Sequence, residues 1–221
     1  MRIKNVFFVA IVSLALLFQG CTSTQKGAGI GAVAGGVIGA IIGKASGDTA
    51  AGAVIGAAVG GTAGAIIGHQ MDKAAKEIEE EIPGVNVDRV EEGIIVEFSN
   101  DILFEINRFD LSNEAKENLD KLAIILDRYP DTDVEVHGHT DITGRRAFNQ
   151  TLSENRARAV AEYLVYKGID ASRLAIIGFG PDQPKYSNDT PEGRIKNRRE
   201  EFAITANEEM KQRAEEEAAG N

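Results

Sequence analysis

The sequence predicts an α+β fold in which helices cover one face of a mixed sheet, preceded by a separate glycine-rich helical hairpin. Three observations support this fold class. Glycines recur at every fourth position within residues 27–68, which places them on one face of a helix. Short apolar runs within residues 85–206 alternate as strands do, and the segments between them repeat apolar residues every three or four positions, as helices do.

The composition of the chain excludes several classes of function. The 221 residues are enough for one domain of about 100–150 residues with extensions, and 43% of them are hydrophobic. The formal net charge of −10 argues against nucleic acid as a partner, because proteins that bind DNA or RNA usually carry a basic surface. Cys21 is the single cysteine, so an intramolecular disulfide and a cysteine-based zinc site are both excluded.

Residues 1–20 have the organisation of a secretion signal. Arg2 and Lys4 precede an apolar run, 6–18, which is shorter than the roughly 20 residues of a spanning helix. Cys21 follows directly. This order resembles a bacterial lipoprotein signal, in which the peptide is cut before the cysteine and the thiol is acylated. An ordinary secretion signal is the alternative.

The lipoprotein resemblance implies how the chain is anchored. Residues 1–20 would be removed, and residues 21–26 would form a tether that carries palmitate or a similar acyl chain on Cys21. Each buried CH₂ of an acyl chain contributes about 0.8 kcal/mol, so several chains hold a protein on a membrane. Thr22 stands where an aspartate often marks retention in the inner membrane, which favours the outer membrane.

Residues 27–69 contain two copies of one glycine-rich pattern. Glycine costs about 1 kcal/mol relative to alanine inside a helix, so a regular stripe of glycines indicates close helix packing. The pattern predicts a hairpin of two helices joined by their glycine faces, with Ile41, Ile42 and their copies Ile66 and Ile67 facing outward. The stripes are Gly27, Gly31, Gly35, Gly39 and Gly43 in the first copy, and Gly52, Gly56, Gly60, Gly64 and Gly68 in the second.

A bilayer or a second copy of the chain would cover the outward faces of this hairpin. Whether the hairpin spans the membrane stays open, and a flexible glycine-alanine linker is the alternative structure. The segment after it is rich in lysine and glutamate, so we predict a linker helix within 70–84 that ends before Pro83-Gly84.

Residues 85–206 form a series of predicted strands and helices. Gly168 is the predicted C-terminal cap of the second long helix, and residues 207–221 are an acidic tail, predicted as a frayed helix without an evident function. In order, the predicted elements are a strand hairpin over 85–98, a helix over 112–129, a strand over 133–139, a helix over 149–166, a strand over 174–177, a short helix over 193–199 and a strand over 202–205.

An acid and an arginine flank the start of the second long helix. Asp141 lies in the loop after the 133–139 strand, while Asn149 and Arg156 are seven residues apart and therefore share a helix face. Two interpretations are open. Asp141 and Arg156 form a structural ion pair, or they bind a zwitterion, with Asp141 accepting from an ammonium group and Arg156 holding a carboxylate.

The wider pattern around these residues resembles the OmpA-like peptidoglycan-binding domains, over about 85–206. The resemblance implies an OmpA-like (β/α/β/α/β-β) domain that binds peptidoglycan non-covalently through the meso-diaminopimelate of its peptide stem, and that is not an enzyme. The matching residues are Gly138-His139-Thr140-Asp141-Ile142-Thr143-Gly144, Asn149, Leu152-Ser153, Arg156-Ala157, Gly178-Phe179-Gly180-Pro181, Glu192-Gly193-Arg194 and Asn197-Arg198-Arg199.

The resemblance also implies roles for single residues. Asp141 matches the acid that pairs with the ligand ammonium, and Arg156 matches the arginine that holds its carboxylate. Two departures from the family pattern stand out: Glu105 replaces a frequent aspartate, and Glu200 replaces an apolar residue, which puts the start of the last strand in doubt. The other residues implied to lie at the pocket are Glu105, Ile106, Thr140, Asn149 and Arg198.

The implied partners are peptidoglycan and the lipid bilayer, with no cofactor and no nucleic acid. The domain would lie in the periplasm, anchored to the outer membrane through Cys21, and the glycine stripes could pair copies of the chain. A structural adaptor that binds a protein partner is an alternative. A metal-dependent hydrolase is the other, because His137, His139 and Asp141 alternate along a strand and so could converge on one ion.

Overall fold

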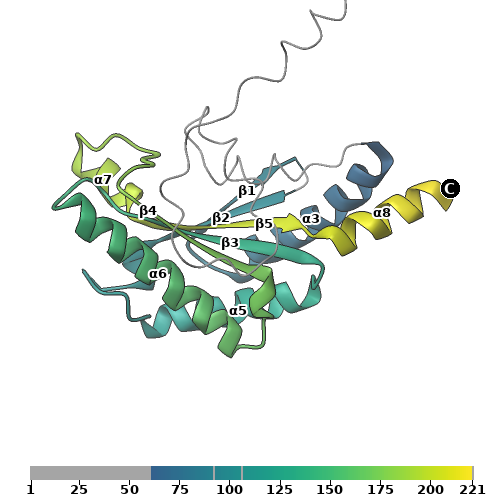
Figure 1. Cartoon of the computed structure of the whole chain (residues 1–221), viewed down its shortest axis with the longest axis horizontal. Helices are drawn as coiled ribbons and strands as arrows, with labels where there is room; N and C mark the ends of the chain where they lie inside the picture. Colours follow the sequence, from purple (N-terminus) through teal and green to yellow (C-terminus); the bar gives the residue numbers. More distant parts are fainter. Residues whose placement is uncertain (1–60, 92, 106, 221) are drawn as a thin grey trace, which may run out of the picture. The chain divides into compact units, whose positions relative to one another are not determined.

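The computed structural model describes residues 61–91, 93–105 and 107–220. The expected signal peptide, the tether and most of the glycine-rich hairpin fall outside these residues. The described part is a mixed sheet with helices, as predicted (Figure 1). Its elements are α3 (Gly61–Glu81), β1 (Val85–Val90), β2 (Gly93–Ser99), α4 (Asn100–Leu103), α5 (Asn113–Arg128), β3 (Thr132–His139), α6 (Arg146–Tyr166), η3 (Ala171–Arg173), β4 (Leu174–Gly180), α7 (Pro191–Asn197), β5 (Arg199–Ala206) and α8 (Glu208–Gly220).

The five strands lie in the order β1-β2-β5-β3-β4. β3 and β4 are parallel because α6 connects them as a crossover, whereas the β1–β2, β2–β5 and β5–β3 pairs are antiparallel. Helices α5 and α6 lie on the same side of the sheet (Figure 1). Alternate residues of the central strands, among them Val136 and Phe202, are fully buried in the core on that side.

Helix α5 begins where its sequence predicts. The side chain of Ser112 accepts a hydrogen bond from the Ala115 backbone N–H at 2.9 Å, which satisfies one of the free donors of the first turn. Its apolar residues, including Leu119 and Leu122, are fully buried. The predicted spacing of three and four residues therefore marks the face that packs on the sheet.

The boundaries of two other elements differ from the prediction. Helix α6 begins at Arg146, three residues before the predicted start at Asn149. Strand β4 continues through Gly178 to Gly180, beyond its predicted end at Ile177. A Cβ atom on Gly178 would lie 2.6 Å from the backbone nitrogen of Glu154 in α6, so this glycine allows α6 to lie close to the strand. The predicted short helix and last strand also begin earlier, at Pro191 and Arg199.

Helix α3 corrects one expectation about the glycine-rich segment. It runs unbroken from Gly61 to Glu81, through the expected boundary between the hairpin and the linker helix. Ile67 was predicted to face outward, but it is fully buried in the same core as the sheet. Ile67, Met71 and Ile78 form one apolar stripe along α3, and this stripe packs against the rest of the domain.

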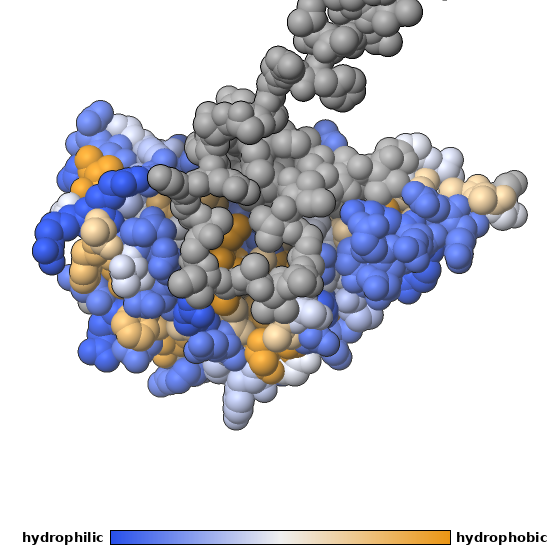
Figure 2. Space-filling model, in the orientation of Figure 1, coloured by the Kyte–Doolittle hydropathy of each residue, from blue (hydrophilic) through white to orange (hydrophobic). Residues whose placement is uncertain are grey.

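The acidic C-terminal segment is a helix, as predicted, but it packs against the domain, so the expectation that it is frayed is wrong. Helix α8 lies beside α3 (Figure 1), and it buries Met210 and Ala214 there. The Asn207 side chain accepts a hydrogen bond from the Met210 backbone N–H at 3.0 Å, which caps the helix. The outer surface around α3 and α8 is mostly hydrophilic (Figure 2). Within 61–220, none of the helices combines the length and hydropathy needed to cross a membrane.

Candidate functional site

A cavity of about 1030 Å³ opens at the end of the sheet where β2 and β3 terminate. Its walls come from α4, the loop after β3, the first half of α6, and α7. Asp141 and Arg156 both line it, together with Thr140, Asn149, Glu105 and Arg198. Six of the seven predicted pocket residues therefore meet at one place, and the seventh, Ile106, lies outside the described residues.

Asp141 is held in the loop by two hydrogen bonds. Its Oδ1 accepts from the Thr143 backbone N–H at 2.7 Å, and its Oδ2 accepts from Nη1 of Arg198 at 2.8 Å. Burial opposes ionisation of this carboxyl group, but the contacts with Arg198 and Thr143 outweigh it and lower the pKa of Asp141. The side chain is an anion at neutral pH, in an orientation set by its partners.

Arg156 is buried in the opposite wall of the cavity. Its Nε donates to the Arg108 carbonyl at 2.9 Å, and its Nη2 donates to the Glu105 carbonyl at 3.4 Å. The guanidinium also lies over the ring of Phe104, 5.0 Å from the ring centroid. These contacts use two of the five N–H groups of the guanidinium and fix its plane.

Asp141 and Arg156 are separate charges at one cavity. Among the described residues, Asp141 forms an ion pair with Arg198 and none with Arg156. The interpretation of Asp141 and Arg156 as a structural ion pair is therefore wrong. Asp141 does have a cationic partner, although that partner is about one third exposed at the cavity wall.

The other predicted residues mostly organise the loops around the cavity. Nδ2 of Asn149 donates to the carbonyls of Asp141 at 3.2 Å and Thr143 at 3.0 Å, so it holds the acid-bearing loop onto α6. The Thr140 hydroxyl donates to the Asp141 carbonyl at 3.0 Å. The side chain of Glu105 is 82% exposed, and its backbone carbonyl rather than its carboxylate contacts Arg156.

Sequence reasoning missed several residues of the cavity wall. Asp101 of α4 lies 3.9 Å from Nη2 of Arg198 and adds a further acid to the cavity. Ile195 of α7 adds an exposed apolar surface, and Arg194 lies beside it. The Glu192-Gly193-Arg194 pattern identified α7 as part of the family signature, but it did not indicate that α7 faces the cavity.

The alternative metal site of His137, His139 and Asp141 does not form. Asp141 lines the cavity, while His137 and His139 lie beside Glu201 of β5. A register irregularity between Gly138 and His139 occurs where β3 meets β4, and Asp141 lies beyond the end of the strand. The alternation that made the three residues seem to share a face therefore ends before Asp141.

Glu200, which stands where the family pattern has an apolar residue, leaves the last strand intact. Glu200 pairs with Phe98 of β2 and Gly138 of β3 in a regular ladder, and its side chain is fully buried. Burial raises the pKa of the Glu200 carboxyl well above its usual value, and the nearby charges of Arg156 and Arg199 oppose this only in part. The doubt about the start of β5 was therefore unfounded.

Two protein families match the chain. The model of the OmpA family matches residues 103–198, and the model of the YMGG-like glycine zipper matches residues 1–72. The first match contains all the cavity residues discussed above except those of α4 that precede residue 103. The second covers the glycine repeats and the first part of α3.

Several individual proteins are also similar to this chain. The chain is 38% identical over 216 residues to the probable lipoprotein YiaD of Escherichia coli (strain K12), which covers 91% of this chain and 98% of that protein. It is 44% identical over 88 residues to the peptidoglycan-binding protein ArfA of Mycobacterium bovis, covering 40% of this chain and 27% of that protein. Among solved structures, the cell wall anchor of the type VI secretion system of Pseudomonas aeruginosa is similar, with a TM-score of 0.54 and 28% identity over 62% of this chain and 96% of that one.

Proposed function

Because the chain belongs to the OmpA family, and to its branch of lipoproteins with a glycine zipper, we propose that it binds peptidoglycan and links the wall to the outer membrane. The family and its lipoprotein relatives are structural, so the protein is not an enzyme. In this proposal Cys21 carries the acyl anchor, and the cavity binds the diaminopimelate of the peptide stem.

One observation carries the choice of ligand. The cavity holds an anion, Asp141, and a cation, Arg156, that are oriented by other partners and not by each other. Diaminopimelate ends in a carbon that bears both an ammonium and a carboxylate group. The ammonium would contact Asp141 beside Arg198, and the carboxylate would accept from the N–H groups of Arg156 that the backbone carbonyls leave available.

The same geometry favours diaminopimelate over a lysine-type stem. Lysine lacks the terminal carboxylate, so its binding would leave the buried guanidinium of Arg156 without the carboxylate that diaminopimelate supplies. Charge-assisted hydrogen bonds contribute about 1.5–3 kcal/mol each, which corresponds to roughly tenfold to hundredfold in affinity. A protein anchored beside a polymeric ligand needs only moderate affinity for one stem, because anchoring raises the effective concentration.

Binding of the full-length protein to isolated peptidoglycan sacculi, and calorimetry with free diaminopimelate, would test this proposal. We expect Asp141→Asn and Arg156→Ala each to weaken binding at least about tenfold. Arg146 and Asp182 form an exposed ion pair away from the cavity, so Asp182→Asn and Arg146→Ala are matched controls that should bind as the parent does. If both cavity variants are folded, by circular dichroism, and still bind normally, the assigned roles are wrong.

A further inference from the structure

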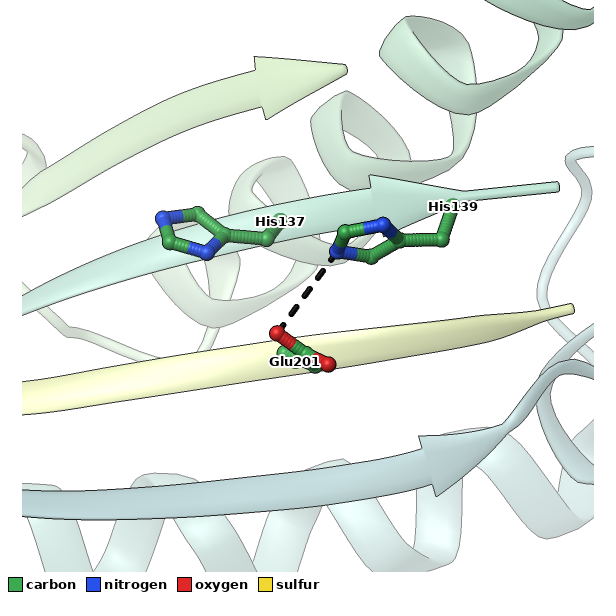
Figure 3. Close-up of side chains that lie close together, drawn as sticks. All are labelled: His137, His139 and Glu201. Carbon is green, nitrogen blue, oxygen red and sulfur yellow. Dashed lines mark ion pairs between the residues drawn. The ribbon is translucent and has the colours of Figure 1, made fainter. Parts of the chain in front are cut away.

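Two histidines and a glutamate meet on the sheet face opposite the core packed by α5 and α6. His137 and His139 alternate along β3 with Val136, which points into that core, and Glu201 is the direct cross-strand partner of His137 on β5. All three side chains are buried, with at most 1% of each residue exposed. Figure 3 shows the ring of His139 turned toward the carboxylate of Glu201, with His137 beside it on the same strand.

Each of the three residues has a buried ring nitrogen or carboxylate oxygen without a hydrogen-bond partner. These atoms are Nδ1 of His137, both ring nitrogens of His139 and Oε2 of Glu201. One ligand atom from each of the three residues can be chosen so that all lie within 4.8 Å of one another, and Nε2 of His139 is 3.6 Å from Oε2 of Glu201. A buried polar atom without a hydrogen-bond partner destabilises the folded state, so four in one place call for an explanation.

The opposite sides of two of these groups are already held. Nε2 of His137 lies 2.8 Å from Oε2 of Glu135, and Oε1 of Glu201 accepts from Nε of Arg199 at 2.6 Å. A histidine that ligates a metal commonly donates its other ring N–H to a carboxylate, which fixes the tautomer and the ring plane. Glu135 is in the place for this role, with Nδ1 of His137 left to face His139 and Glu201.

We propose that His137, His139 and Glu201 bind one divalent transition-metal ion, with Zn²⁺ as the ion that fits best. Two imidazole nitrogens and one carboxylate oxygen are a common zinc ligand set, and water would take the fourth position. Zinc ligands at about 2.0–2.2 Å in a tetrahedron are roughly 3.3 Å apart, close to the distance between His139 and Glu201.

The charge around the three ligands also suits a cation. Nε of Arg199 contacts Glu201, and Arg199 and Lys185 both approach Glu97, the cross-strand neighbour of Glu201, at 3.9 and 3.1 Å. With neutral imidazoles, the three carboxylates of Glu97, Glu135 and Glu201 exceed these two cations by one negative charge. Phe179 stacks against His139 with ring centroids 5.2 Å apart, which keeps that ring in the orientation needed for binding.

The test uses the full-length protein in detergent, unfolded in urea with a chelator and refolded with or without Zn²⁺, because the ligand atoms are buried. We expect one bound zinc per chain after dialysis, and a higher melting temperature than the zinc-free protein. Refolding with Co²⁺ instead should give the visible absorption of a tetrahedral cobalt site. A protein that refolds with neither bound zinc nor a cobalt spectrum would overturn the proposal.

Variants locate the ion. His139→Phe keeps an aromatic ring against Phe179 but removes the nitrogen, and it should weaken zinc binding at least about 100-fold. His69→Ala is the matched control, since His69 is an exposed histidine on α3. Equal zinc content in His139→Phe and the parent would show that the ion binds elsewhere, and would refute the site.

Two further variants separate the roles within the site. Glu135→Gln should keep one zinc per chain but weaken binding about 10–100-fold, as expected of a residue that orients a ligand. Arg156→Ala should bind zinc as the parent does, because the cavity and the metal site use different side chains. Failure of peptidoglycan binding and failure of zinc binding are therefore distinguishable.

Discussion

Replacement of Gly138 by alanine should destabilise the domain and weaken the proposed binding of diaminopimelate. A Cβ atom at this position would lie 2.3 Å from the carbonyl oxygen of Ser153 and 2.9 Å from its carbonyl carbon, and both are backbone atoms of α6. Unstrained contacts of this kind are about 1 Å longer, so α6 would have to move away from the sheet by about that amount.

The size of both effects follows from the residues of α6 that would move. Overpacking of a tight core typically costs about 1–3 kcal/mol, and here the clash is with backbone that cannot rotate away. Asn149 and Arg156 would move with the helix, so the loop of Asp141 would loosen while the guanidinium shifts from its carbonyl partners. A displacement of 1 Å in a binding group can cost a large part of its hydrogen bonds.

Urea unfolding and calorimetry with diaminopimelate would measure both effects. Gly144→Ala is the control for the loss of a glycine near the site: its φ of +94° strains the backbone, but no atom lies within 4 Å of a Cβ there. We expect Gly138→Ala to lose more stability than Gly144→Ala. A Gly138→Ala protein as stable as the parent would refute the close approach of α6 to β3.

Two further predictions concern the buried acid and the C-terminal helix. Above about pH 4.5 the unfolded state releases the Glu200 proton, whereas the folded state keeps it because the pKa is raised. The contribution of this group to folding is therefore fully present at low pH, and it is lost as the pH rises through the folded-state pKa. The unfolding free energy of Glu200→Gln should therefore increase relative to that of the parent as the pH rises, by at most about 1.4 kcal/mol per pH unit. Urea titrations of both proteins at pH 5 and pH 8 would measure this difference. A difference that does not depend on pH would contradict the raised pKa of Glu200. Met210→Ala should cost about 2–5 kcal/mol because this side chain is buried between α8 and the domain, whereas Gln212→Ala, on the exposed face of the same helix, should leave the melting temperature unchanged. Equal melting temperatures for the two variants would mean that α8 does not pack.

Local pattern was sufficient for most of the fold. The three- and four-residue spacing of α5 and the alternation of β3 each follow from one face being buried, so they are visible in neighbouring residues. Boundaries were less well predicted where glycines occur. Gly178 and Gly180 are typical of a turn, yet they continue β4, because the close approach of α6 leaves no room for a Cβ at Gly178.

The residues of the candidate site and their contacts were each predicted only in part. The spacing of Asn149 and Arg156 placed both on the helix face that meets Asp141, and both line the cavity with it. The ionic partner of Asp141 is Arg198, which is 57 residues away in the sequence. No spacing rule connects these two residues, since the loop after β3 and the end of α7 meet only when β3 and β5 pair.

The sequence by itself determined most of the helices and strands, and six of the residues that line the cavity, because periodicity and motif order are properties of the chain. Tertiary structure alone decided that Ile67 faces inward, since α3 packs against α8 and the sheet. It also decided that Glu201, and not Asp141, joins the two histidines. Cross-strand register is a relation between distant segments, and the free energy that selects it comes from the whole core.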